Sequence, residues 1–249
     1  MKGWTKLLLD IVMGAVIPIL ILNNLTRVIG APPAYVLAAL VPVTYVLADT
    51  FFISRRFNAI TTYVALTAIM NGVLAFWFVD GWRYALKDTA GLIVAVILFF
   101  GSLVIGKPMF QFFIAQVVQP DTPEKARSLQ TLFTKSEVKR GMVAATALVG
   151  ATNATLGIAN FLLNLNIVTA PFGTEAFNSQ VAEVNAITRI AFTLGSFVVF
   201  AVAFYLAYRA LFKVLPSEEG KSQFESEFWD LVHLAEQKAG TQAASAAAE

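Results

Sequence analysis

Two acidic residues lie inside long apolar stretches of this 249-residue chain, where an ionisable side chain is costly unless it has a partner. Asp10 lies about one helical turn after the start of one stretch, and Asp49 lies about one turn before the end of the next. Because neighbouring spans run in opposite directions, we expect both carboxylates at a similar depth on the same side. They could bind a proton or a cation, or each could pair with a basic residue and fix helix packing.

A row of asparagines follows in a later apolar stretch. Asn153, Asn160 and Asn164 are seven and four residues apart, so they share one face of a predicted helix. Asn71 lies at a matching depth in another stretch. Such amides can line a path for an ion or a polar solute, and they can equally join helices through hydrogen bonds of about 1 kcal/mol each. Together with the two carboxylates, these asparagines form the candidate ion or solute path.

The composition excludes most catalytic designs. The chain has no cysteine, which excludes thiol nucleophiles, disulfides and Cys-based metal sites, and its single histidine, His233, lies in a polar tail. The sequence contains no glycine-rich phosphate loop, His-Glu metal pattern or Ser/His/Asp set. We therefore expect a protein that is not an enzyme, with no catalytic residues, no metal and no cofactor.

Hydrophobic residues make up 57% of the chain and charged residues 14%, whereas soluble domains are about 25% charged. The mean hydropathy is +0.69. Apolar runs near the ~20 residues that a spanning helix needs predict an all-α, polytopic membrane protein with six transmembrane helices in a domain over residues 1–215. The predicted spans are about 7–26, 34–53, 60–79, 89–106, 142–168 and 187–211.

Local signals refine this outline at both ends of the chain. The first apolar run is predicted to stay as a transmembrane helix, because Asp10 and Pro18 make it unlike a cleaved signal peptide. Pro18 and Pro42 lie within the first two spans and are expected to kink them. Residues 216–249 are predicted to form a cytoplasmic tail that is helical to about 239 and disordered beyond.

A short segment follows the fourth span. Lys107 and Pro108 end that span, because a cation suits a helix C-terminus and proline cannot continue the hydrogen-bond ladder. Residues 109–119 are apolar but too short to cross the bilayer, which predicts an interfacial helix or a re-entrant segment. Asp121 or Thr122 is placed to cap a further helix in the loop that follows.

The basic residues are distributed unevenly between the two sides of such a fold. With six spans, the side opposite the termini receives only four of the 18 Lys and Arg residues. The positive-inside rule therefore predicts that both termini are cytoplasmic in a cell inner membrane. The cytoplasmic interface contains Arg55, Arg56, Lys107 and Pro108, and we expect it to attract anionic lipids rather than nucleic acid. Any working site is expected there, beside the two carboxylates.

Several of these residues form a pattern that resembles a known family. The pattern consists of Asp10 with Pro18, then Pro42, then Arg55-Arg56 with Asn58, then Asp80, Lys87, Ser102 and Lys107-Pro108. Over about residues 7–118 the chain thus resembles the bacterial intracellular septation protein A-like family of small inner-membrane proteins. The resemblance implies a multi-spanning protein linked to cell-envelope synthesis or division through contacts with other membrane proteins.

Two functions follow as expectations. The first is a non-enzymatic scaffold or factor in cell-envelope maintenance or division, which binds the lipid bilayer and other membrane proteins or further copies of itself. The alternative is a small proton- or cation-coupled transporter or channel that uses the intramembrane Asp and Asn residues. An inverted repeat would favour transport. None is evident, because the proline-interrupted early spans differ from the asparagine- and glycine-rich later ones.

Overall fold

The computed structural model describes residues 9, 12–49, 52, 59–216 and 227–246, and every regular element within those residues is a helix. Four of the described helices are long and apolar enough to cross a membrane. They are α4 (Ala31–Ala48), α6 (Gly81–Val104), α9 (Ser136–Ile167) and α10 (Glu175–Lys213). The described part of the chain is therefore all-α, and its four candidate spans are those of an integral membrane protein, as the composition predicts.

Three of these helices extend beyond the apolar runs from which they were predicted. α6 begins at Gly81 instead of about 89, α9 at Ser136 instead of about 142, and α10 at Glu175 instead of about 187. The added turns contain charged and polar residues, which form helices readily but do not belong to an apolar run. Since α9 and α10 have 32 and 39 residues, both are longer than the ~20 residues that cross the hydrocarbon.

The chain packs as two compact units, and α6, α9 and α10 each contribute residues to both. Unit 1 comprises the described residues within Met1–Leu98 and Gly150–Val198. Unit 2 comprises those within Phe99–Val149 and Val199–Glu249. The predicted boundary between the transmembrane domain and the tail, at residue 216, lies within unit 2.

Unit 1 begins with a helical segment that contains Pro18. Its elements are η1 (Val12–Val16), α2 (Ile17–Leu20), η2 (Ile21–Leu25) and α3 (Thr26–Ile29), of which η1 and η2 are π-helical turns. The wide turns on both sides of Pro18 adapt the backbone to the hydrogen bond that proline cannot donate. Gly30 then ends α3 with φ of +87°, a conformation that favours glycine, and α4 runs back along the unit.

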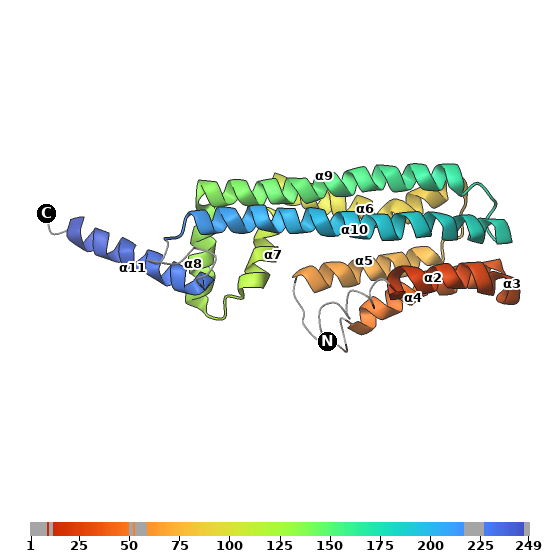
Figure 1. Ribbon diagram of the computed structural model, residues 1–249, viewed down its shortest axis with the longest axis horizontal. Coiled ribbons are helices and arrows are strands. Elements are labelled where there is room, and N and C mark those ends of the chain that lie inside the picture. Colours follow the sequence, from red (N-terminus) through yellow and green to blue (C-terminus); the bar gives the residue numbers. More distant parts are fainter. Residues whose placement is uncertain (1–8, 10–11, 50–51, 53–58, 217–226, 247–249) are drawn as a thin grey trace. The chain divides into compact units, whose positions relative to one another are not determined.

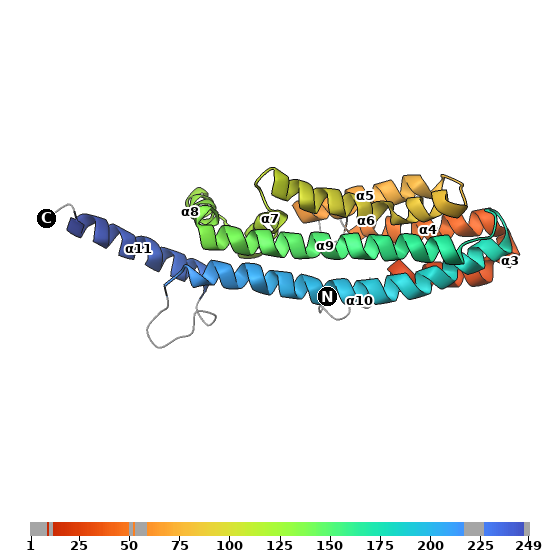
Figure 2. The same ribbon diagram turned by 90° about the horizontal axis from the view of Figure 1, so that it is seen from above.

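α5 (Ala59–Ala75) lies antiparallel to α4 (Figures 1 and 2). Gly72 of α5 packs against α4, where an added Cβ would lie 3.2 Å from Val43 Cγ1. Pro42 lies inside α4, and the helix continues through it. α5 ends at Ala75, before the predicted end at about 79, and residues 76–80 connect it to α6.

Three connections meet at one end of unit 1, namely Gly30, residues 76–80 and residues 168–174 (Figure 1). Asp80 Oδ2 accepts a hydrogen bond from the Phe172 amide at 3.2 Å. This hydrogen bond joins the connection at residues 76–80 to the connection at residues 168–174. It therefore helps to fix the ends of the helices that these connections join.

An aromatic core lies behind these connections. Tyr35, Tyr84 and Phe177 pack with ring centroids 5.0 to 6.3 Å apart, and all three side chains are buried. Phe172 covers the core from its connection and stacks on Phe78 with centroids 4.9 Å apart. The core thus joins α4, α6 and α10 with the segments between the helices.

Unit 2 is built on three shorter helices with parts of α6, α9 and α10. The shorter helices are α7 (Met109–Val118), α8 (Pro123–Thr134) and α11 (Phe228–Ala246). α7 occupies the segment predicted to be interfacial or re-entrant. Its Phe110 is fully buried, its ring centroid lies 5.3 Å from that of Phe204, and its amide donates to Thr146 Oγ1 at 3.2 Å. α11 extends past 239, where the sequence predicted disorder, because its alanine-rich end favours a helix.

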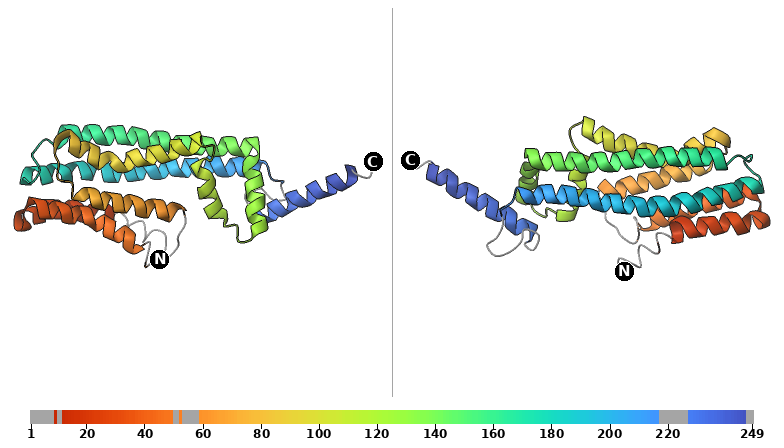
Figure 3. Two further views of the ribbon diagram at one scale, coloured as in Figure 1. Left: turned by 180° about the vertical axis from the view of Figure 1, so that it is seen from behind. Right: turned by 45° about the horizontal axis from the view of Figure 1, so that its top comes forward.

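α7 and α8 form a helical hairpin, and α11 begins beside it (Figure 3). Thr122 caps α8 by accepting a hydrogen bond from the Lys125 amide at 3.2 Å, which confirms one of the two predicted caps. The Lys125 ammonium pairs with Asp121 at 2.7 Å, and this hydrogen bond holds the pKa of Asp121 below its ordinary value. Trp229 attaches α11, because its Nε1 donates to the Val118 carbonyl at 2.7 Å.

Candidate intramembrane polar site

The asparagine face of α9 meets a carboxylate of α6 within unit 1. Asp88 Oδ2 accepts hydrogen bonds from Asn160 Nδ2 at 3.1 Å and from Asn164 Nδ2 at 3.0 Å. Asp88 is the eighth residue of α6, about 10 Å along the helix from its start. The carboxylate therefore lies inside a helix that is apolar enough to span a membrane, and its two partners are one helical turn apart on the neighbouring helix.

Further hydrogen bonds fix the two amides. Asn160 also donates to Thr89 Oγ1 at 3.1 Å, and Asn164 donates to the Asn160 carbonyl at 2.9 Å. Asn160 is 4% exposed and Asn164 is 0% exposed. Asn164 Oδ1 is buried and makes no hydrogen bond within the described part of the chain. A buried amide oxygen without a donor can accept a hydrogen bond from a protonated group or coordinate a cation.

Small residues allow the neighbouring helices to approach α6 at this level. A Cβ added to Gly157 of α9 would lie 3.5 Å from Leu92 Cβ and 3.7 Å from Thr89 Cγ2. On another side, a Cβ added to Gly91 would lie 3.9 Å from Asn71 Oδ1 of α5. The first glycine brings Asn160 and Asn164 within reach of Asp88, and the second places Asn71 one turn along α6 from that carboxylate.

Lys87, which precedes the carboxylate, points to different partners. Its side chain donates to the Trp77 carbonyl at 2.6 Å, and Nζ lies 4.7 Å from the ring centroid of Tyr35 and 5.8 Å from that of Tyr84. Lys87 is only 6% exposed. A carbonyl oxygen and two ring faces replace part of the water that a buried ammonium loses. The lysine therefore binds the connection at residues 76–80 to the aromatic core.

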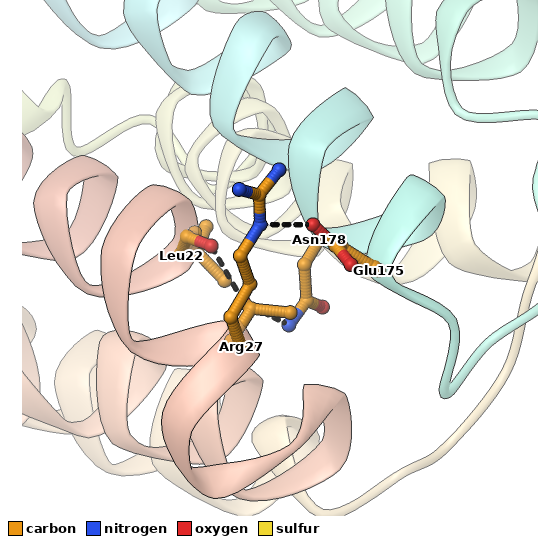
Figure 4. Close-up of polar contacts among 5 residues, drawn as sticks. Leu22, Arg27, Glu175 and Asn178 are labelled. Atoms are coloured by element: carbon orange, nitrogen blue, oxygen red, sulfur yellow. Dashed lines mark hydrogen bonds and ion pairs between the residues drawn. The ribbon is translucent and has the colours of Figure 1, made fainter.

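A second set of contacts, drawn in Figure 4, joins the first helical segment to α10. Arg27 Nε donates to Glu175 Oε1 at 2.6 Å, and both side chains are exposed. Asn178, which is 1% exposed, donates to Thr26 Oγ1 at 2.9 Å (Figure 4). It also donates to the Ala31 carbonyl at 2.8 Å. Because water screens the exposed pair, the buried amide contributes more to this junction. These residues hold the helix ends and lie apart from Asp88.

The residues predicted from the sequence fall into four groups. Asn160 and Asn164 are brought together at Asp88, with Asn71 on the adjacent turn. Asn153 is half-buried elsewhere on α9, and Asp49 is half-buried at the C-terminal end of α4.

Asp10, Arg55 and Arg56 lie outside the described residues. Lys107 is exposed and Pro108 is buried before α7; both belong to unit 2.

Asp88 itself was not among the predicted site residues. The predicted span begins at Thr89, the first residue of the uncharged run, and therefore excludes Asp88. A helical reading from Gly81 would have placed Asp88 on the same face as Ala85 and Leu92, facing a neighbouring helix. No protein-family model, curated protein or solved structure matches the chain.

Replacing Asn164 by leucine tests whether the amides stabilise the Asp88 carboxylate. A hydrogen bond to a charged group contributes about 1.5–3 kcal/mol in proteins, and interhelical bonds in membranes average about 0.6 kcal/mol. We expect Asn164→Leu to lower the free energy of unfolding in detergent by about 1–3 kcal/mol.

Asn166→Leu is the matched control, because Asn166 is exposed and donates to the Leu162 carbonyl of its own helix at 2.7 Å. Its change should stay within about 0.5 kcal/mol. A double-mutant cycle of Asn164→Leu with Asp88→Asn should give a coupling of at least about 0.5 kcal/mol. Equal losses for both asparagines, with no coupling to Asp88, would contradict this role.

Proposed function

We propose that the chain is a small proton- or cation-coupled transporter or channel of a cell inner membrane, and that Asp88 with Asn160 and Asn164 forms its binding site. One observation carries the proposal: a carboxylate within an apolar helix is held by two buried amides, and the oxygen of one amide has no donor among the described residues. Ionisable residues at such positions often belong to ion or proton pathways.

The chemistry of the site suits a hard cation or a proton. Both amide nitrogens donate to the same oxygen, Asp88 Oδ2, which leaves Oδ1 as an acceptor. Together with Asn164 Oδ1, this oxygen supplies the carboxylate and amide ligands that hard cations prefer. A proton would instead bind the carboxylate and remove its charge. Either event changes the strength of the bonds between α6 and α9, and so couples occupancy to helix packing.

The proposal includes six spans with both termini in the cytoplasm. The uneven distribution of Lys and Arg supports this orientation. The three connections that meet at one end of unit 1 are those assigned to the non-cytoplasmic side, and the Asp80–Phe172 and Asn178–Ala31 hydrogen bonds support that common placement. On the opposite side, clustered basic residues would attract anionic lipids.

A scaffold in cell-envelope maintenance or division is the second candidate. The resemblance to septation protein A-like proteins suggested it, and the apolar face of α10 favours it. Leu194, Phe197 and Val198 are exposed on that helix, and a Cβ added to Gly195 would meet nothing within 4 Å. Exposed apolar helices with small residues can associate with other membrane helices or with a second copy. If the chain is a scaffold, the hydrogen bonds of Asp88 stabilise the fold and Asp88 takes no part in ion transport.

Single cysteines test the proposed orientation, because the chain has none of its own. Ala176, in the first turn of α10, and Lys135, between α8 and α9, are both exposed. In intact spheroplasts a membrane-impermeant maleimide should label Ala176→Cys, and it should label Lys135→Cys only after lysis. Labelling of Lys135→Cys without lysis, or of both variants alike, would contradict the proposed topology.

Flux measurements in proteoliposomes test the proposed activity. Proton or sodium flux should require the protein, and Asp88→Asn should reduce it to the level of protein-free liposomes, because the amide cannot ionise. Glu183→Gln, a control at an exposed acid of unit 1, should retain flux. If folded wild-type protein carries no flux, or if Asp88→Asn carries as much as wild type, the transporter proposal fails and the scaffold reading remains.

A further inference from the structure

Unit 2 has a shallow apolar groove between α7 and α10. Val117 of α7 and Phe204, Tyr205 and Tyr208 of α10 line it, and its volume is about 430 Å³. This volume lies within the range of about 300–1,000 Å³ found for small-molecule pockets. The groove is too short to hold a partner helix along its length, since only four residues line it.

The side chain at the floor of the groove is packed in an aromatic cluster, whereas the side chains at its edges are exposed. Phe204 belongs to a cluster with Phe110 and Phe200, whose ring centroids lie 5.3 and 5.5 Å from its own. Val117 and Tyr205 are 52% and 56% exposed. A ligand can therefore lie against a rigid aromatic surface without displacing the core of unit 2.

A basic side chain lies at one end of this groove. Arg209 is four residues after Tyr205, so it stands one turn further along the same face of α10, and it is exposed. Arg209 forms no ion pair with another residue that the structure describes. The apolar groove thus ends beside a cation that has no acidic partner among those residues.

We propose that this groove binds an anionic phospholipid, with an acyl chain against Tyr205 and Tyr208 and the phosphate beside Arg209. The charge complementarity favours a lipid over a neutral apolar ligand, because guanidinium groups bind phosphate oxygens through paired hydrogen bonds. Aromatic residues with polar tips are also typical of the level at which lipid headgroups begin. The site lies within unit 2 and does not depend on ion binding at Asp88.

Native mass spectrometry of the detergent-solubilised protein tests the proposal with phosphatidylglycerol and phosphatidylcholine as probes. The wild type should bind phosphatidylglycerol in preference to phosphatidylcholine. Arg209→Gln should weaken phosphatidylglycerol binding about fivefold, the effect expected for one basic residue near an anionic headgroup. Arg127→Gln is the matched control, because Arg127 is an exposed arginine of unit 2 on α8. It should bind as the wild type does.

A second variant tests the groove itself. Val117→Trp places a large ring in the groove from an exposed position, so it should reduce binding of phosphatidylglycerol without disturbing the buried face of α7. The proposal is overturned if Arg209→Gln and Arg127→Gln weaken binding equally, which would indicate general surface charge. It is also overturned if the two lipids bind the wild type alike, or if Val117→Trp binds phosphatidylglycerol as well as the wild type does.

Discussion

A carboxylate within an apolar helix must have partners, and this requirement determines how α6 packs in unit 1. Asp88 obtains two amide donors from α9, at Asn160 and Asn164. Bonds of this kind, between a charged group and buried donors, are stronger than the interhelical bonds between neutral groups that are usual in membranes. They also fix the rotation and the register of α9, because a turn of either helix would leave the carboxylate without these two donors. Gly157 makes the necessary approach of the two helices possible.

The requirement that polar groups have hydrogen-bond partners also explains the contacts at the end of unit 1 where the connections meet. Backbone groups in connections lack the hydrogen bonds of a helix, so other residues must supply them. Lys87 donates to the Trp77 carbonyl, Asn178 donates to the Ala31 carbonyl, and Asp80 accepts from the Phe172 amide. Asn178 and Asp80 each bind a backbone group that is distant in sequence, and Lys87 binds the connection that leads into its own helix. The polar residues therefore organise the interior, whereas much of the apolar surface of α10 is exposed, as expected for a face that meets lipid.

The sequence predicted the helical, membrane-embedded character of the chain and the shared face of Asn160 and Asn164, because both depend on local periodicity. It did not predict Asp88 as their partner. Apolar runs identify the part of a helix that crosses hydrocarbon, and the structure shows that α6 begins before its apolar run. Asp10 and Asp49 are candidates by their depth in predicted spans, but contacts between helices depend on packing that a single sequence does not specify. Hydrogen bonds such as that from Asn178 to Ala31 join residues far apart in the chain and have no local signal.

The packing of α6 against α9 can be measured directly with engineered cysteines, since the chain has none of its own. A Cβ at residue 157 would lie 3.5 Å from Leu92 Cβ, at the short end of the roughly 3.5–4.5 Å that disulfides span. In native membranes treated with an oxidant, Leu92→Cys with Gly157→Cys should form a disulfide rapidly. Leu92→Cys with Ile158→Cys should not, because Ile158 is 64% exposed on another face of α9. Rapid crosslinking of the second pair and none of the first would contradict the register that places Asn160 and Asn164 at Asp88.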